Sequence, residues 1–216
     1  MLFDCKNSEM GIFLDNFHKI YQNGNYKREV IEMVTRMEYL QKLLDWKDEK
    51  VIKVITGIRR CGKSTLLLQY QEHLKEQGID DSQIISVNFE DLQYEELLDY
   101  KTLYDYIQKR LCKDKMTYIF LDEIQKVDSF EKVVDSLHIK EHTDIYLTGS
   151  NAYMLSSDLA TLLTGRYVEL SMLPLSFKEY AQLTNDTSEH AFSDYMRYGG
   201  LPYVAAMDKT DEKADM

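Results

Sequence analysis

The stretch Gly57-Ile58-Arg59-Arg60-Cys61-Gly62-Lys63-Ser64 matches the phosphate-binding pattern G-x-x-x-x-G-K-[ST] at every fixed position. The β-branched residues before it, 51–56, predict a buried strand, and the apolar residues of 65–74 recur at helical spacing. A strand, a glycine loop and a helix in this order are the setting in which the motif binds phosphate. The stretch therefore predicts an α/β fold built around a phosphate site.

Each fixed residue of this loop has a physical role. Gly57 and Gly62 allow the tight turn that points backbone N–H groups inward, and the following helix adds its positive N-terminal end. Lys63 would place its ammonium on the β- and γ-phosphates of a nucleotide, and the Ser64 hydroxyl would bind Mg²⁺. The residues expected to contact the nucleotide are Gly57, Ile58, Arg59, Arg60, Cys61, Gly62, Lys63, Ser64 and Thr65.

Three variable positions of the loop have alternative interpretations. Cys61 lies beside Lys63 and a helix N-terminus, two features that lower the pKa of a thiol. A redox-sensitive loop is one interpretation of Cys61, and a small residue at a permissive position is the simpler one. Arg59 and Arg60 would contact phosphate or nearby acids, with solvated loop cations as the default interpretation.

Strand and helix patterns alternate along the rest of the chain. Further strands are predicted at residues 84–89, 117–121, 144–148 and 167–170. Helices are predicted at about residues 30–46, 102–112, 127–137, 155–163, 176–180 and 189–198. This alternation predicts a central, mainly parallel five-stranded sheet with helices on both faces, which is a three-layer sandwich.

Two acids, Asp122 and Glu123, end the predicted strand 117–121. We expect this strand to lie beside the first strand, so that Asp122 reaches the metal opposite Ser64. Glu123 would then orient or deprotonate an attacking water. Acids at a strand end also serve as helix caps, but their combination with the loop favours catalysis.

Two further sites in the sequence are candidates for assisting catalysis. The run Leu147-Thr148-Gly149-Ser150-Asn151 ends another predicted strand, where Ser150 or Asn151 would position the water or sense the γ-phosphate. A plain turn accounts for the same residue types without a ligand. Arg166 would deliver a guanidinium to the γ-phosphate, in its own subunit or across an interface, and a surface ion pair is the alternative.

Five segments together resemble the prokaryotic AAA-type ATPases, and the resemblance covers approximately residues 35–204. The segments are ITGIRRCGKSTLL, YIFLDEIQKV, IYLTGSNAYML, LLTGRYVELSMLPLSFKEY and YGGLP. The resemblance implies an AAA-like P-loop NTPase fold with an additional strand. The site residues that it implies are a Walker A loop at Gly57–Ser64, a Walker B acid at Asp122, a catalytic Glu123, a sensor at Ser150 or Asn151, and an arginine at Arg166. Members typically continue into a C-terminal winged-helix or nuclease-like region.

We expect three parts in the chain: 1–32, 33–173 and 174–216. The codons for Lys27-Arg28-Glu29-Val30 can form a purine-rich stretch that resembles a ribosome-binding site upstream of Met33. This predicts that residues 1–32 are a mis-started extension, with a flexible N-terminal arm as the alternative. The ATPase domain would occupy 33–173, and 174–216 would be a helical segment and the truncated start of a C-terminal region.

Composition narrows the classes of function. With 216 residues, 44% apolar and 29% charged, the chain can bury a globular core. A net charge of −11 argues against a broad nucleic-acid surface. The chain has neither an apolar run near the roughly 20 residues of a membrane span nor a secretory signal at its start, so we expect a cytoplasmic location. Its His and Cys residues lack metal-site spacing.

These observations predict Mg²⁺-dependent binding and hydrolysis of ATP, coupled to conformational change in attached domains or partners. ATP and Mg²⁺ are the expected cofactors. A protein partner or self-association is compatible with this prediction, whereas direct nucleic-acid and membrane contacts are not expected. The alternative is a nucleotide-dependent switch that does not hydrolyse. A small-molecule kinase is disfavoured, because an Arg-rich lid is lacking and the Asp-Glu pair favours water as acceptor.

Overall fold

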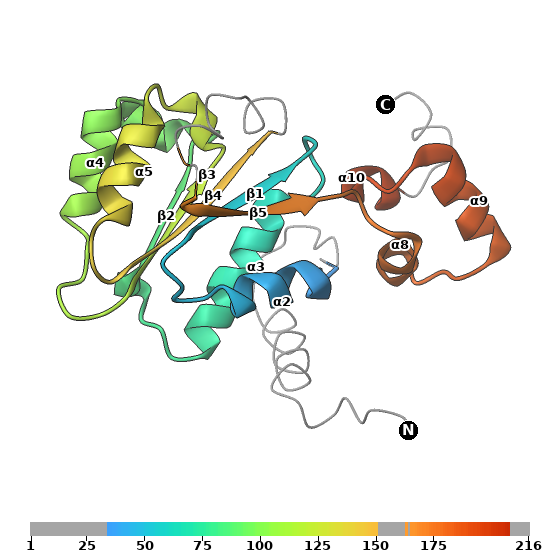
Figure 1. Ribbon diagram of the computed structural model, residues 1–216. Coiled ribbons are helices and arrows are strands. Elements are labelled where there is room, and N and C mark those ends of the chain that lie inside the picture. Colours follow the sequence, from blue (N-terminus) through green and yellow to red (C-terminus); the bar gives the residue numbers. More distant parts are fainter. Residues whose placement is uncertain (1–33, 151–162, 164, 208–216) are drawn as a thin grey trace. The chain divides into compact units, whose positions relative to one another are not determined.

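The five predicted strands form one parallel sheet in a computed structural model, which describes residues 34–150, 163 and 165–207 (Figure 1). The strands are β1 (Ile52–Gly57), β2 (Ile84–Asn88), β3 (Thr117–Asp122), β4 (Thr143–Ser150) and β5 (Tyr167–Met172). Their order is β2-β3-β4-β1-β5, and every neighbouring pair is parallel. The predicted α/β class and five-stranded sheet are confirmed, and the sheet is wholly parallel.

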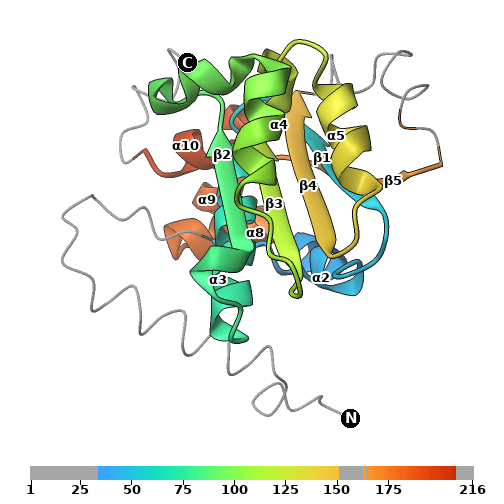
Figure 2. The same ribbon diagram turned by 90° about the vertical axis from the view of Figure 1, so that its left-hand side faces the viewer.

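Helices cover both faces of this sheet. The α-helices are α2 (Met37–Asp45), α3 (Lys63–Glu76), α4 (Tyr100–Gln108), α5 (Phe130–His138), α8 (Phe177–Thr184), α9 (Glu189–Tyr198) and α10 (Pro202–Ala205). Short 3₁₀ turns occupy Asp81–Gln83, Leu92–Leu98 and Ile124–Lys126. Helices α4 and α5 lie on one face, and α2 and α3 lie on the other (Figures 1 and 2). The three-layer arrangement is therefore present.

The centre of the sheet forms the core. All residues of β1 and β3 are buried, because helices cover these strands on both faces. In contrast, the edge strand β2 alternates between buried and more exposed positions. A large cluster of buried apolar side chains lies between the sheet and the helices α4 and α5. This packing holds the carboxyl ends of the strands, where ligands of such sheets bind, in fixed positions.

The expectation that the strand ending in Asp122 lies beside the first strand is wrong. β4 lies between them, because it pairs with β1 on one side and with β3 on the other. The chain builds β2 and β3 at the outer edge of the sheet and then returns through α5 to fill the place next to β1. The additional strand thus separates the two motifs by one strand position.

Some helix boundaries also differ from the predictions. α2 begins at Met37, since Arg36 adopts φ −84° and ψ 71°, which is not helical. The helix predicted from Val127 begins at Phe130, after a 3₁₀ turn. The predicted helix at 155–163 falls almost wholly outside the described residues, as do residues 1–33.

Between β5 and residue 207, where the described part of the chain ends, the helices are α8, α9 and α10. α8 begins with a capping box in which the Ser176 side chain binds the Glu179 N–H and Glu179 binds back to Ser176. Pro202 opens α10, at the position where a missing N–H costs nothing. A small apolar cluster of Leu175, Tyr180, Ala191 and Ala205 joins these helices. Within the described ranges, none of the helices is long and apolar enough to cross a membrane.

Candidate active site

The loop between β1 and α3 needs glycine at both of its fixed glycine positions. Gly62 has φ 103°, which L side chains rarely adopt. A Cβ on Gly57 would lie 2.5 Å from the carbonyl oxygen of Met172 and 2.8 Å from the Cys61 Sγ. Residues 57–64, which the sequence predicts to be the phosphate-binding loop, are therefore packed directly against the end of β5.

The Lys63 ammonium is buried at this loop. Its side chain is 3% exposed, and Nζ donates to the carbonyl oxygens of Gly57 at 3.2 Å and Ile58 at 3.3 Å. Across the described residues, Glu123 supplies the one carboxylate within 4.0 Å of Nζ, with its Oε1 3.6 Å away. Because a buried cation is unfavourable without close anionic partners, this arrangement suits a bound anion.

Asp122, Ser64 and Thr148 come together at the carboxyl ends of β3 and β4. Asp122 accepts a hydrogen bond from the Thr148 hydroxyl, and the Ser64 hydroxyl lies near the same carboxylate. Burial raises the pKa of Asp122 above its ordinary value, although the Thr148 and Ser64 hydroxyls and Lys63 oppose the shift. A serine hydroxyl and a carboxylate within hydrogen-bonding reach are hard oxygen donors, which Mg²⁺ prefers. The residues present therefore fit this ion.

Glu123 is held in a restrained conformation. Its backbone has φ 57°, a left-handed conformation that is uncommon for residues other than glycine and is found preferentially at functional sites. Its N–H donates to the Thr148 hydroxyl at 2.9 Å, and its Oε2 accepts from Gln125 Nε2 at 2.5 Å. The Gln125 Oε1 is buried and has no hydrogen-bond partner in the part of the chain that the structure describes. One carboxylate oxygen thus faces Lys63 and the other is fixed by an amide.

The surroundings of Cys61 disfavour a reactive thiolate, which the redox-sensitive interpretation requires. The side chain is fully buried, and burial raises the pKa of the Cys61 thiol despite the nearby charges of Lys63 and Arg36. The features that lower a thiol pKa are therefore outweighed by loss of water. The simpler interpretation, a small residue that fits the loop, agrees with the contact of its Sγ with Gly57.

The remaining residues expected to contact the nucleotide differ in their exposure and in their contacts. Ile58, Arg59 and Arg60 are exposed, and Arg60 has φ 66°. Arg59 forms a 3.2 Å ion pair with Glu90, so an acid close to the loop is its partner, as one of the alternatives expects. Thr65 is half-buried in the first turn of α3.

The structure does not bring Arg166 to the loop. Arg166 precedes β5 at the amino end of the sheet, where its carbonyl accepts from Ile52, and its Nη1 lies 2.8 Å from Asp135. Gly57 pairs with Met172, the last residue of β5, so six residue steps of about 3.3 Å each separate Arg166 from the loop along the strand. The Asp135 contact agrees with the surface ion pair alternative.

Of the two sensor candidates, the structure describes the backbone of Ser150, which ends β4. Ser150 pairs with Gly57 in the β1–β4 register, so its backbone reaches the base of the loop. Asn151 lies outside the described residues.

A cavity of about 400 Å³ lies elsewhere, at the open edge of β2. Its lining includes Gln71 and Lys75 of α3, Ser86 of β2 and Arg110 after α4. None of the phosphate-loop residues lines it. The candidate active site is therefore defined by the loop and the strand ends, not by this cavity.

Three residues of the site were not singled out from the sequence. Thr148 bridges Asp122 and Glu123, Gln125 binds Glu123, and Arg36 donates to the carbonyl oxygen of Cys61 at 3.3 Å. A polar residue inside the buried run of β4 was the available signal for Thr148. Arg36 falls within a stretch predicted to be helical, so the sequence offered no comparable signal for it.

Comparison with known proteins shows the family of this chain. A family model described as "AAA domain" matches residues 49–181. An uncharacterised protein of Haemophilus influenzae is 43% identical over 183 residues, which are 82% of this chain and 46% of that protein. An uncharacterised protein of Methanocaldococcus jannaschii is 32% identical over 180 residues, 76% of this chain and 38% of that one. The chain spans less than half the length of these curated relatives.

Two solved structures share the fold at low sequence identity. A Walker-type ATPase of Pyrococcus abyssi has a TM-score of 0.58 and 18% identity, over 81% of this chain and 66% of that one. Cdc6p of Pyrobaculum aerophilum has a TM-score of 0.55 and 10% identity, over 85% of this chain and 62% of that one.

Proposed function

Because the chain belongs to the AAA-domain family of P-loop ATPases, we propose that it binds Mg·ATP at residues 57–64 and hydrolyses it. The observation that supports this most strongly is the buried Lys63 ammonium, whose nearest carboxylate oxygen is 3.6 Å away. A phosphate oxygen would supply a closer anionic partner for Lys63 than the Glu123 carboxylate does. The wholly parallel sheet also places the loop and both acids at the edge where such ligands bind.

Binding divides between two groups of residues. Lys63 and the backbone N–H groups of the loop hold the phosphates, and the N-terminal end of α3 adds its partial positive charge. Ser64 and Asp122 would hold Mg²⁺, which neutralises charge on the phosphate oxygens when it is bound. Thr148 orients the Asp122 carboxylate for this task.

Glu123 acts on the water. It accepts a proton as the water oxygen forms a bond to the γ-phosphorus, while the bond to the bridging oxygen of ADP breaks. Gln125 and the Thr148 hydroxyl restrain Glu123 at two points, so the carboxylate is oriented before the reaction. Ser150 or Asn151 would complete the contacts to the water or the γ-phosphate.

Coupling to other parts of the protein belongs to the same proposal. Since the chain spans less than half of its curated relatives, the conformational change would act on attached domains or on a protein partner. Any contribution of Arg166 to hydrolysis requires a neighbouring copy, because this residue precedes β5 at the opposite end of the sheet. The cytoplasmic location and the lack of nucleic-acid contact stay predictions.

Release of phosphate from Mg·ATP by the purified chain tests the proposal. The Glu123→Gln variant should bind Mg·ATP as the wild type does and release phosphate at least about 100-fold more slowly. Glu72→Gln is the matched control, because Glu72 is a half-buried acid of α3 that pairs with Lys75. Undiminished release by Glu123→Gln would refute the role of Glu123. Binding without release by the wild type would instead favour the non-hydrolysing switch.

A further inference from the structure

One side chain, Arg36, contacts both the phosphate-binding loop and the segment that leads to α8. Arg36 directly precedes α2 and is 5% exposed. Its Nη1 donates to the carbonyl oxygen of Cys61 at 3.3 Å, and also to that of Leu173 at 2.7 Å. A single nitrogen therefore joins the loop to the residues that follow β5.

The other two nitrogens of the Arg36 side chain, Nε and Nη2, bind α8 and the residue Pro174 that precedes it. Nε and Nη2 donate to the two carboxylate oxygens of Glu179 at 2.8 and 3.1 Å, and Nη2 also donates to the carbonyl oxygen of Pro174 at 3.3 Å. Glu179 is the same residue that caps the first turn of α8. The guanidinium also lies over the Tyr39 ring, 4.6 Å from its centroid. This planar, bidentate geometry is specific to arginine.

The contact with Cys61 controls the direction of a phosphate-binding N–H. In a trans peptide the N–H points opposite to the C=O, and the described residues contain no cis peptide. Because Arg36 holds the Cys61 carbonyl, the N–H of Gly62 points away from Arg36. Among the described residues, this N–H has no acceptor. Arg36 thus orients a free backbone donor within the loop.

We propose that Arg36 is a positioning residue that couples the phosphate-binding loop to α8. The peptide 61–62 and the first turn of α8 share one hydrogen-bonding group, so a shift of either one changes the contacts of the other. The use of this coupling by a nucleotide rests on the function proposed above. When phosphate binds the Gly62 N–H, the position of α8 changes with the loop.

Hydrogen–deuterium exchange of the whole chain tests the coupling without any nucleotide. Glu179→Gln retains a residue that can form the capping box but removes the charge that pairs with Arg36. The variant should raise the exchange rate of peptides 57–64 and 177–184 together, by about tenfold, since a charge-assisted hydrogen bond is lost. Asp144→Asn is the control, because it breaks another buried ion pair, Lys53–Asp144, at the amino ends of the strands. It should leave the exchange of 57–64 unchanged.

A second variant tests the use of the coupling by nucleotide. Arg36→Lys keeps the charge but cannot bridge the three carbonyl oxygens and Glu179. We expect its Kd for Mg·ATP to rise about tenfold and the nucleotide-dependent protection of α8 to disappear. A merely structural role would leave that protection in place.

Two results would overturn the coupling. One is wild-type exchange of residues 57–64 in Glu179→Gln, and the other is an equal rise of that exchange in Asp144→Asn. Failure of the wild type to bind Mg·ATP would remove the proposed function instead. Whether or not Mg·ATP binds, the comparison of Glu179→Gln with Asp144→Asn without nucleotide tests the coupling through Arg36.

Discussion

Lys63 places a buried ammonium at the centre of the proposed nucleotide site. Its hydrogen bonds go to two backbone carbonyls of the loop, and the Glu123 carboxylate is 3.6 Å away. Removing an ammonium from water is expensive unless charge or hydrogen bonds compensate. The folded chain tolerates this cost at the place where a phosphate would be bound. The Glu123 carboxylate, which we propose acts on the water, is held close to the same cation.

The Thr148 hydroxyl connects Asp122 with Glu123, so its loss should weaken the position of both acids. Its hydroxyl donates to Asp122 and accepts from the Glu123 N–H, so Thr148→Val keeps the shape but leaves both groups without a partner. We expect a loss of roughly 1–3 kcal/mol in the free energy of unfolding, as for other buried groups left unpaired. The rate of phosphate release should fall at least about tenfold, since each kinetic factor of ten needs only about 1.4 kcal/mol.

Chemical denaturation and steady-state phosphate release measure these two effects. Thr143→Val is a useful control, because Thr143 is also buried in β4 but donates to carbonyls at its amino end. Wild-type turnover in Thr148→Val would contradict the bridging role.

Residues whose type is fixed by a sequence motif could be predicted from the sequence. Residues whose role depends on strand pairing or on distant contacts could not. Lys63, Ser64 and Asp122 belong to patterns in which phosphate or Mg²⁺ dictates the residue type. Thr148 matters only because β4 pairs with β3, which puts it beside Asp122. The role of Arg36 likewise arises from contacts with residues far along the chain.

At the scale of elements, α8 depends on one carboxylate for two purposes. Glu179 caps the helix through Ser176 and pairs with Arg36. Burial alone would raise the pKa of Glu179, but hydrogen bonds from Arg36 and Ser176 outweigh it and lower the pKa below its ordinary value of 4.5. The start of α8 is therefore expected to weaken in acid.

The pH dependence of stability tests this directly. A carboxyl group with a lowered pKa in the folded state stabilises above its unfolded pKa, and the stabilisation is lost as pH falls through the folded pKa. Wild type should exceed Glu179→Gln by roughly 1.5–3 kcal/mol in unfolding free energy at pH 7. The difference should shrink steadily below pH 4.5, because a protonated Glu resembles Gln. Urea denaturation at several pH values measures it, and a difference independent of pH would contradict the account.

Element order was predicted better than element position. The alternation of strands and helices follows from local periodicity, and the N-terminus of α8 follows from its capping box. The position of β4 between β1 and β3 depends on contacts between residues far apart in the sequence, so the local periodicity of the residues does not predict it. The start of α2 was missed because Arg36 takes a non-helical conformation that serves its distant partners.

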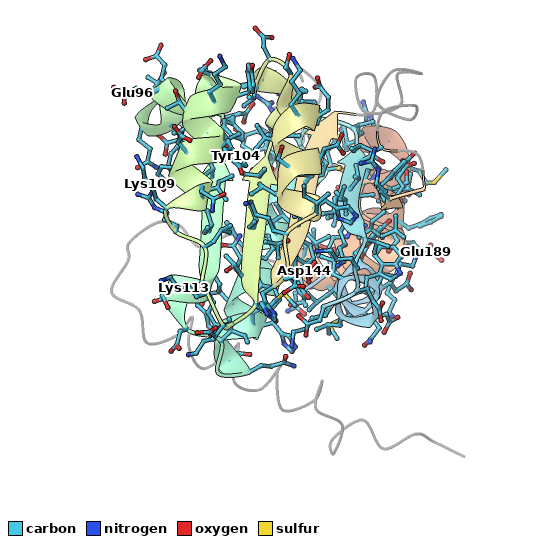
Figure 3. All side chains as sticks on the ribbon, turned by 60° about the vertical axis from the view of Figure 1, so that its left-hand side comes forward. Glu96, Tyr104, Lys109, Lys113, Asp144 and Glu189 are labelled. Carbon is cyan, nitrogen blue, oxygen red and sulfur yellow. The ribbon has the colours of Figure 1, made fainter. Side chains whose placement is uncertain are left out.

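At the scale of the whole molecule, the two ends of the sheet have different roles. The carboxyl ends bear the loop and both acids, whereas the amino ends bear a buried ion pair in which Lys53 Nζ lies 2.5 Å from Asp144 Oδ1. Tyr146 and the Asp48 N–H also donate to Asp144, each at 2.9 Å. Figure 3 shows Asp144 inside the molecule, in contrast to surface residues such as Lys109 and Glu189. The amino ends are thus a structural anchor.

Asp144→Asn should separate stability from function. It leaves Lys53 buried without its carboxylate, which typically costs about 3–5 kcal/mol. The affinity of the remaining folded protein for Mg·ATP should stay within about twofold, since distant sites contribute independently. Thermal unfolding and a nucleotide titration at a temperature where the variant is folded measure both. A large loss of affinity in folded Asp144→Asn would contradict this division.

Calorimetric titration of Mg·ATP into the folded chain, paired with the Lys63→Ala variant, tests the central claim most directly. We predict saturable heat with one site per chain for the wild type. For Lys63→Ala, whose fold is checked by circular dichroism, we predict a loss of affinity of at least about 100-fold, as expected when a buried charge partner of the phosphates is removed. A folded wild type that gives no heat, or a Lys63→Ala variant that binds equally well, would contradict the assignment of the nucleotide site to this loop.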